Sequence, residues 1–197
     1  MSNPPQEQLN AASPQQRSDA RRNRAKVLAA ARDLAADGDL GLPFNVIARR
    51  AGVGVGTVYR QFANPAALLE ALILDRLEML VRETVAVVAE EHDPGIALRR
   101  VLQAAFHALL ADPALATVLA SPRFEYPETT KLGAALAATV TDLLTKARAT
   151  RQVRPDVSAD DLRRLLSGVH HAVRAGEASP ELADRYLHVL LDGLAPG

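Results

Sequence analysis

The stretch "AGVGVGTVYRQF", residues 51–62, spaces three glycines two apart and follows them with side chains that bond phosphates or base edges. Such a run serves either as a phosphate cradle for a nucleotide or as the hinge of a helical DNA-gripping motif. A dinucleotide-binding turn needs a glycine where Thr57 stands, and a P-loop needs a lysine directly after Gly56. The preceding run, "FNVIARRA", has helical and not strand-like apolar spacing. Motif and context both exclude the nucleotide cradle.

The hinge interpretation fits the same residues. A helix that reaches Ala51 can end with Gly52 in the left-handed conformation, which glycine adopts without a steric penalty. Ala48, four residues earlier, is small enough for two helices to cross closely, and Val58, six residues later, gives the second helix an apolar face. This is the spacing of a helix-turn-helix. The opposite face of the second helix carries hydrogen-bonding side chains: Thr57, Arg60 and Gln61.

An amphipathic helix precedes this motif. Apolar residues repeat at helical spacing in "RSDARRNRAKVLAAARDLAADG" and predict a helix that ends near Gly38. Residues 17–62 contain nine Lys and Arg against four Asp and Glu, whereas the whole chain has a net charge of zero. Surface helices often carry arginines that are merely solvated, but beside a helix-turn-helix this local positive charge favours phosphate binding.

These residues together resemble a known family. The stretch "RAKVLAAARDLAADGDLGLPFNVIARRAGVGVGTVYRQFANPAALLEAL" resembles the DNA-binding domain of TetR-type transcriptional regulators. The resemblance covers about a quarter of the chain and rests on order, spacing and composition together. It implies that the protein binds an operator as a dimer and represses transcription until a small ligand enters its C-terminal domain.

The resemblance also implies roles for single residues. Thr57 and Tyr59 match positions that hold DNA phosphates, and Arg60 matches one that reads a base edge or a phosphate. Gln61 replaces the family's usual histidine, and Pro65 and Ala66 stand where Lys-Glu is usual, so we expect the basic first helix to compensate for a missing lysine contact. The predicted DNA-binding residues are Arg22, Arg24, Lys26, Val55, Gly56, Thr57, Tyr59, Arg60 and Gln61.

Composition limits the class of protein. A chain of 197 residues with 48% hydrophobic and 4% aromatic content suits helices packed on helices. The absence of cysteine excludes disulfides and thiolate metal sites, and agrees with a cytoplasmic protein. No apolar run is long enough to predict a membrane span. We predict a disordered tail over 1–16, a helix-turn-helix domain over 17–63 and a helical ligand-binding and dimerisation domain over 64–197.

The second half of the chain shows helical periodicity without strand-like alternation. Its patterns predict helices over 65–90, 94–112, 113–121 and 127–151. Ser158 is the expected cap of the next helix, and Ser179 with Pro180 opens the last one. Gly176 and Gly193 are the expected stops of these two helices.

Nothing in this half predicts catalysis. None of the five histidines occurs in H-E-x-x-H spacing, and no G-x-S-x-G motif is present. His170 and His171 are adjacent and project about 100° apart on a helix, so they do not share one site. We therefore expect no catalytic residue, no metal and no cofactor.

The apolar faces of the last helices predict contacts with a second copy of the chain or with the core. By the resemblance, the last two helices form the dimer interface: Leu162, Leu166, Val169, Val173, Leu182, Tyr186, Val189 and Leu190. The middle helices mix small residues with scattered polar groups, as a ligand pocket does, although core packing is the alternative for each residue. The predicted ligand-binding residues are Leu102, Phe106, His107, Phe124, Val140, Leu144, His170 and Arg174.

The sequence thus predicts an all-α protein with an N-terminal three-helix helix-turn-helix domain and a C-terminal helical domain. Its expected partners are double-stranded operator DNA, a second copy of itself and a small apolar effector that releases the repressor, with no membrane. Two alternatives remain open: a DNA-binding regulator without an effector, and a helical enzyme whose helix-turn-helix is incidental. A cavity whose ligand changes DNA binding would favour the effector-released repressor. A bound cofactor beside the histidines would favour the enzyme.

Overall fold

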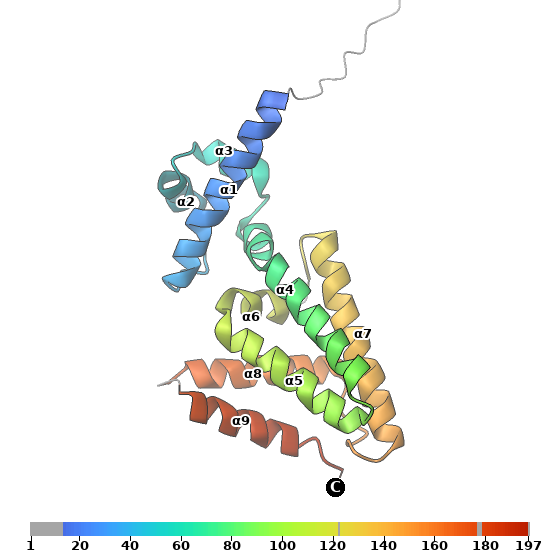
Figure 1. Cartoon of the computed structure of the whole chain (residues 1–197). Coiled ribbons are helices and arrows are strands. Elements are labelled where there is room, and N and C mark those ends of the chain that lie inside the picture. The colour runs from blue at the N-terminus through green and yellow to red at the C-terminus, as the bar shows by residue number, and fades with distance from the viewer. Residues whose placement is uncertain (1–13, 122, 177–178, 197) are drawn as a thin grey trace, which may run out of the picture. The chain divides into compact units, whose positions relative to one another are not determined.

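The computed structural model describes residues 14–121, 123–176 and 179–196. Within these residues every regular element is an α-helix, so the predicted all-α fold is confirmed (Figure 1). The chain divides into two compact units, one ending at Pro65 and the other beginning at Ala66.

The N-terminal unit contains three helices: α1 (Pro14–Ala36), α2 (Phe44–Ala51) and α3 (Val55–Gln61). The long α1 packs against both shorter helices. Their shared core consists of fully buried side chains: Val27, Ala31, Ile47, Val58 and Phe62. α1 begins three residues before the start predicted at Arg17, because proline is compatible with the first turn of a helix. Residues 1–13 of the predicted tail lie outside the described residues.

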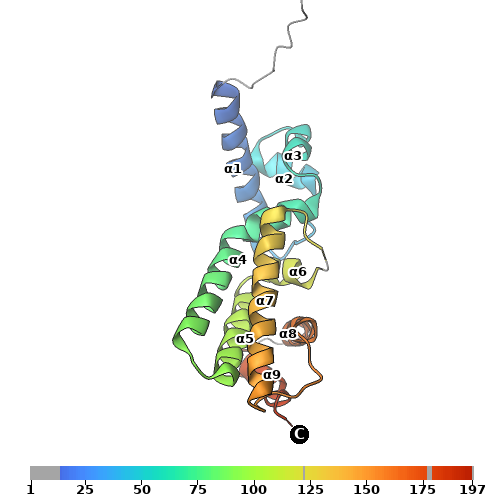
Figure 2. The same cartoon turned by 90° about the vertical axis from the view of Figure 1, so that its right-hand side faces the viewer.

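The C-terminal unit contains six helices over its described residues: α4 (Pro65–Glu90), α5 (Pro94–Ala111), α6 (Pro113–Ala120), α7 (Pro127–Ala149), α8 (Ala159–Arg174) and α9 (Pro180–Asp192). α5 lies beside α7, and α8 lies beside α9 near the C-terminus (Figures 1 and 2). The hydrophobic side chains of the core between them are aliphatic apart from the fully buried ring of Phe106, and Glu70, Thr84 and Thr129 are buried polar residues. These helices position a cavity and an exposed apolar face.

Side-chain caps and prolines set the helix starts as the sequence predicts. Ser158 Oγ accepts from the Asp161 amide at 3.1 Å while the Asp161 carboxylate accepts from the Ser158 amide at 2.9 Å. The Ser179 hydroxyl accepts from the Leu182 amide at 3.2 Å at the start of α9. Both predicted starts are confirmed. Gly193 caps the end of α9, but α8 ends at Arg174, two residues before the predicted stop.

A single residue joins α5 to α6. The Asp112 amide donates to the Ala108 carbonyl at 3.1 Å, which closes α5. The Asp112 carboxylate accepts from the amides of Ala114 and Leu115 at 2.9 and 3.1 Å, which opens α6. The two helices are bent by 118° at this corner. In the described part of the chain no one helix has the length and apolar character to cross a membrane, and this bent pair meets that test only together.

Candidate nucleic-acid interface and C-terminal cavity

Two glycines build the turn between α2 and α3. Gly52 adopts φ 64°, the left-handed conformation that the sequence predicts, and the Val53 amide donates to the Ala48 carbonyl at 3.0 Å. Gly54 is extended and begins α3 without a side-chain cap. Ala48 and Val58 are both buried, which allows the two helices to cross closely. The geometry is that of a helix-turn-helix.

One face of α3 is exposed and carries hydrogen-bonding groups. Tyr59 is 62% exposed, and its ring meets the edge of Phe44 with the centroids 4.9 Å apart, which fixes the ring orientation. Arg60 Nη2 donates to Thr57 Oγ1 at 2.9 Å, so these two side chains act together at the surface. Val55 and Gly56 lie on the same exposed surface. Groups of this kind bond phosphate oxygens and base edges.

Two of the predicted DNA-binding residues lie between α1 and α3 instead. Gln61 Nε2 donates to the Ala20 carbonyl at 3.4 Å, and among the described residues its Oε1 is buried with no hydrogen-bond partner. The guanidinium of Arg24 stacks over the Phe62 ring at 4.5 Å. Gln61 follows the buried Val58 by three residues, which turns its side chain toward the core side of α3. Both side chains brace the recognition helix against α1.

The exposed basic side chains of this unit lie on α1 as well as on α3. Arg22 and Lys26 are exposed and four residues apart, hence on one side of α1. Arg22 lies 3.7 Å from the Asp19 carboxylate, an exposed pair that competes little with a phosphate. The α1 cations therefore add to the positive potential of the α3 face.

A cavity of about 500 Å³, partly open to solvent, lies in the C-terminal unit. Its walls come from α5, α7 and α8, with Leu119 of α6 and the segment between α6 and α7. Most of the lining is aliphatic, including Leu102, Leu109, Leu136, Val140, Leu162 and Leu166. Size and lining suit a small, largely apolar molecule.

Only part of the predicted ligand-binding set lines this cavity. Leu102, Phe124 and Val140 do so. Leu144 lies at a separate shallow hollow, Phe106 is fully buried core, and Arg174 is exposed. His107 is exposed on the surface and lies 3.7 Å from the Asp184 carboxylate, because the cavity-facing residues Ala105 and Leu109 lie on another side of α5. Periodicity identified the helices but not the face of each that meets the cavity.

His170 lies beside the cavity wall and not in it. Burial lowers the pKa of its imidazole first, and the nearby charges of Arg174 and His171 lower it further. A hydrogen bond involving the Leu109 backbone acts in the opposite direction. Its Nε2 is buried without a hydrogen-bond partner in the described part of the chain. The neutral imidazole therefore packs as a half-buried core group near neutral pH.

The charged groups of the cavity lie near the start of α8, and the sequence did not predict them as cavity residues. Asp160 accepts from Arg163 Nη2 at 2.8 Å and lies 2.7 Å from Arg164 Nη2. Arg163 also donates to the carbonyls of Leu119 and Ala120 at 3.4 and 3.2 Å, so its donors are engaged. Arg164 is more exposed and retains donors at the rim. Arg163 and Arg164 follow Asp160 by three and four residues, a spacing that is equally common among solvated side chains on a helix surface.

The comparisons with known proteins decide the family. Residues 27–72 match the bacterial regulatory proteins of the tetR family, and residues 93–196 match the C-terminal domain of SbtR-like transcriptional regulators. A TetR transcriptional regulator from Streptomyces coelicolor is 30% identical over 88% of this chain and 98% of its own, with a TM-score of 0.51. The chain belongs to the TetR family of transcriptional regulators. No curated protein matches it in sequence.

Two more distant structures share the fold of this TetR-family regulator. FadR from Bacillus subtilis, in complex with stearoyl-CoA, is 18% identical over 86% of this chain and 98% of its own, with a TM-score of 0.61. The ketosteroid transcriptional regulator KstR2 of Mycobacterium tuberculosis is 22% identical over 87% of this chain and 94% of its own, with a TM-score of 0.59. TetR-family regulators bind DNA and are generally non-enzymatic transcription factors. Over the described residues no three His, Asp or Glu side chains group as metal ligands.

The predicted dimer residues of this TetR-family chain separate into buried and exposed sets. Leu162, Leu166, Val173 and Leu190 are buried within the chain, and two of them line the cavity. They are therefore core residues of a single chain, because the inner faces of α8 and α9 pack on the unit itself. Tyr186 and Val189 are 36% and 69% exposed, and Val169 and Leu182 are half-buried. Leu165, on the same helix, is 45% exposed and joins the outer face.

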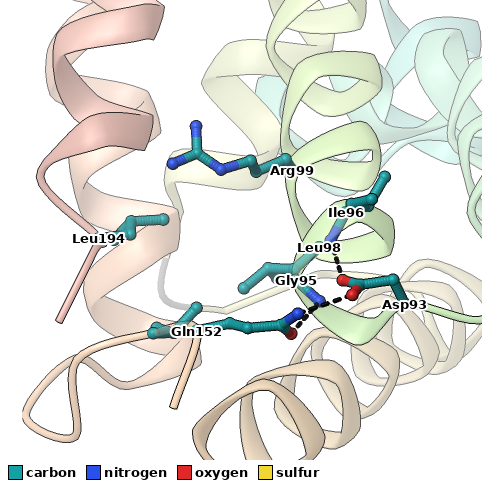
Figure 3. A pocket seen from close by; sticks show the side chains of 8 residues that line it. Asp93, Gly95, Ile96, Leu98, Arg99, Gln152 and Leu194 are labelled. Atoms are coloured by element: carbon teal, nitrogen blue, oxygen red, sulfur yellow. Dashed lines mark hydrogen bonds between the residues drawn. The ribbon is translucent and has the colours of Figure 1, made fainter. Parts of the chain in front are cut away.

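A smaller hollow of about 270 Å³ lies at the start of α5 (Figure 3). Gln152 closes it by donating from Nε2 to Asp93 Oδ2 at 2.6 Å and accepting at Oε1 from the Gly95 amide at 3.0 Å. The Asp93 carboxylate also accepts from the Ile96 amide at 2.9 Å. These polar groups already bond one another, so the hollow is a structural clamp on the α5 N-terminus and not the better candidate for a ligand.

Proposed function

We propose that this TetR-family regulator is a homodimeric repressor that leaves a palindromic operator when a small apolar molecule occupies the cavity of its C-terminal unit. The observation that supports this proposal most is the largely aliphatic cavity of about 500 Å³ in the same chain as a helix-turn-helix. A pocket of this size with apolar walls and a few polar groups is the usual form of a small-molecule site.

The proposed DNA contacts lie on the exposed side of α3. Arg60 reads a base edge, Tyr59 and Thr57 hold phosphates, and the α3 start at Val55 and Gly56 approaches the DNA backbone. Arg22 and Lys26 of α1 add phosphate contacts, which are independent of sequence. Arg24 and Gln61 support this face indirectly, through the Phe62 ring and the Ala20 carbonyl.

The proposed dimer surface is the exposed apolar side of α8 and α9. Leu165, Val169 and Ala172 follow one another at helical spacing on α8, and Leu182, Tyr186 and Val189 do so on α9. Exposed apolar residues in such a continuous pattern indicate a protein interface. A two-fold dimer presents two recognition helices to successive major grooves about 34–36 Å apart, or a multiple of that, and therefore requires a palindrome.

The proposed effector is a small molecule with an apolar body. The aliphatic walls favour such a body, and the rim donors of Arg164 accommodate an acceptor group on it. The shared fold of FadR, solved with stearoyl-CoA, and of a ketosteroid regulator supports the apolar class without identifying the molecule. The effector acts only by binding the non-DNA arrangement more tightly, since equal affinity for both shifts nothing.

A direct test begins with operator selection from random double-stranded DNA by the full-length protein. Saturated fatty acids of graded length and a set of sterols are then screened for thermal stabilisation and for release of the selected operator. Val140→Phe, which fills the cavity, is expected to abolish both effects and leave operator affinity unchanged, while Val140→Ile serves as the matched control. Operator binding that no apolar compound alters, together with no thermal shift, would instead favour the regulator without an effector.

A further inference from the structure

The acid Glu70 of α4 is only 3% exposed, and its carboxylate holds a distant loop. Its Oε1 accepts from the Glu125 amide at 2.6 Å, and its Oε2 accepts from the Tyr126 amide at 3.0 Å. Both amides belong to the segment that leads into α7, more than fifty residues away in sequence. One buried side chain thus fastens α4 to the start of α7.

The same loop forms part of the cavity wall. Phe124, the residue before the two bonded amides, lines the cavity. Its ring lies in a notch made by Gly133 of α7, where an added Cβ would be 2.6 Å from Phe124 Cε2. Glycine inside a helix costs about 0.5–1 kcal/mol relative to alanine, and here it provides the space that the ring occupies. The loop therefore has one side chain in the cavity wall and its backbone fixed to α4.

The two attachments depend on each other. A molecule that moves Phe124 out of its notch also moves the neighbouring Glu125 and Tyr126 amides, because they adjoin it in the chain. A buried carboxylate that loses such bonds is strongly destabilised unless it regains polar partners or water. Glu70 then requires α4 to shift until its carboxylate is solvated. We call the arrangement with both bonds formed the latched state and the arrangement with both bonds broken the unlatched state.

We propose that Glu70 is the positioning residue through which the cavity controls α4. This inference rests on the proposed effector-released repressor and names the contact that carries the response. The chain runs from α3 through Phe62, Ala63 and Asn64 directly into α4, so a shift of α4 reaches the DNA-binding unit along a short connection. An effector that displaces Phe124 favours the unlatched state, and operator DNA favours the latched one.

Linkage fixes the direction of each effect. If the latch couples the two sites, weakening it lowers operator affinity and raises affinity for a cavity ligand, with opposite signs. A merely structural role for Glu70 lowers both, since it reduces the fraction of folded protein. The opposite signs are therefore the diagnostic readout.

The first arm needs no effector. Fluorescence anisotropy with the selected operator compares the full-length wild type with Glu70→Gln, which keeps one acceptor oxygen, and with Glu70→Ala, which keeps none. We expect affinity to fall in that order, with Glu70→Ala in the range of roughly 5- to 150-fold below wild type. Glu78→Gln, an exposed glutamate of the same helix, is the matched control and leaves affinity unchanged.

The second arm uses 1-anilinonaphthalene-8-sulfonate as the cavity probe and Gly133→Ala as a variant remote from Glu70. The added methyl group displaces the Phe124 ring, so this variant is expected to reproduce the Glu70 phenotype: weaker operator binding, tighter probe binding and faster hydrogen exchange at the Glu125 and Tyr126 amides. Thermal unfolding confirms that each variant is folded.

Either of two results overturns the latch. One is normal operator affinity in folded Glu70→Ala and Gly133→Ala despite faster exchange in the loop. The other is a loss of operator and probe binding together. Failure of the probe to bind the wild type argues against the cavity as an effector site. The first arm needs no effector, so it still decides whether the Glu70 bonds to the loop affect operator binding.

Discussion

In the N-terminal unit most of the candidate functional side chains lie on the outside of a seven-residue helix, whereas in the C-terminal unit they surround a space walled by four helices and a loop. The first arrangement follows from the periodicity of one short segment. The second depends on how far several helices stand from one another, which no single segment specifies. A surface site can therefore be read from spacing, while a cavity emerges only from packing.

The largest expected effect concerns the outer face of α8 and α9, the proposed dimer surface of the C-terminal unit. Changing Leu165 and Val189 together to Asp is expected to dissociate the dimer and abolish operator binding, because a single helix-turn-helix buries too little surface for a tight, specific site. Sedimentation velocity at micromolar concentration measures the first effect and anisotropy the second.

Val85→Asp is the control for this double variant, since Val85 is 58% exposed on α4 and lies away from that face. It is expected to leave both assembly and operator binding intact. A wild-type protein that sediments as a monomer would contradict the proposed dimer.

The next effect is on the outside of α3. Arg60→Ala is expected to weaken operator binding by about 1–3 kcal/mol and to relax preference at one base pair, if its fork contacts guanine. Arg49→Ala, an exposed arginine at the end of α2, is the matched control and is expected to change affinity less. Binding to operator variants with single substitutions measures both. Equal losses of operator affinity for the two variants would mean that the positive charge of Arg60, and not its position on α3, explains its contribution to binding.

A smaller effect tests the turn that sets the angle of α3. Gly52→Ala is expected to destabilise the N-terminal unit by about 1–2 kcal/mol, because alanine is strained at the positive φ of this position. Gly176 has no positive φ and open space around its Cβ position, so Gly176→Ala is expected to leave stability nearly unchanged. Urea unfolding followed by circular dichroism compares them. Identical midpoints for the two variants would show that the turn relaxes without cost.

The smallest effect is on the pH dependence of the C-terminal unit. The pKa of Asp93 lies below its ordinary value of 3.8, chiefly because the Ile96 amide donates to it and then because Gln152 does. A carboxylate with a lowered folded-state pKa stabilises the fold above its unfolded pKa, and that contribution is lost as pH falls through the folded value.

Unfolding midpoints of the wild type are therefore expected to decline below about pH 4, partly through Asp93. Asp93→Asn is expected to decline less steeply over the same range, because its side chain does not titrate. Urea titrations between neutral pH and pH 3 measure both slopes. Parallel slopes would assign the acid sensitivity to other carboxylates.

The same contrast explains what could be predicted from the sequence. The left-handed Gly52 and the capping serines Ser158 and Ser179 act through bonds to their own neighbours, so local rules identified them. The all-α fold followed from periodicity in the same way. The contact of Gln61 with the Ala20 carbonyl could not be predicted, because Gln61 lies at the border between the outer and inner sides of α3 and helical spacing does not decide which side its side chain faces.

The interior of the C-terminal unit was predictable only in outline. Leu162 and Leu166 have the apolar spacing of an interface residue and of a core residue alike, and only the packed structure assigns them to the cavity wall. Glu70 gave no local signal, because its partners lie more than fifty residues away. Gly133 is a local signal, since a glycine in the middle of a helix often marks the close approach of another side chain. The sequence does not show that this side chain is Phe124.

The connection between α5 and α6 at Asp112 is as short as it can be. Because one residue both ends α5 and starts α6, it fixes the distance between the cavity residues Leu109 of α5 and Leu119 of α6. Insertions and deletions are normally absorbed in loops, and this side of the cavity has none to absorb them. Relatives of this chain are therefore expected to vary the capacity of the cavity at this corner by exchanging side chains, and changes of chain length are expected in the longer α6–α7 segment instead.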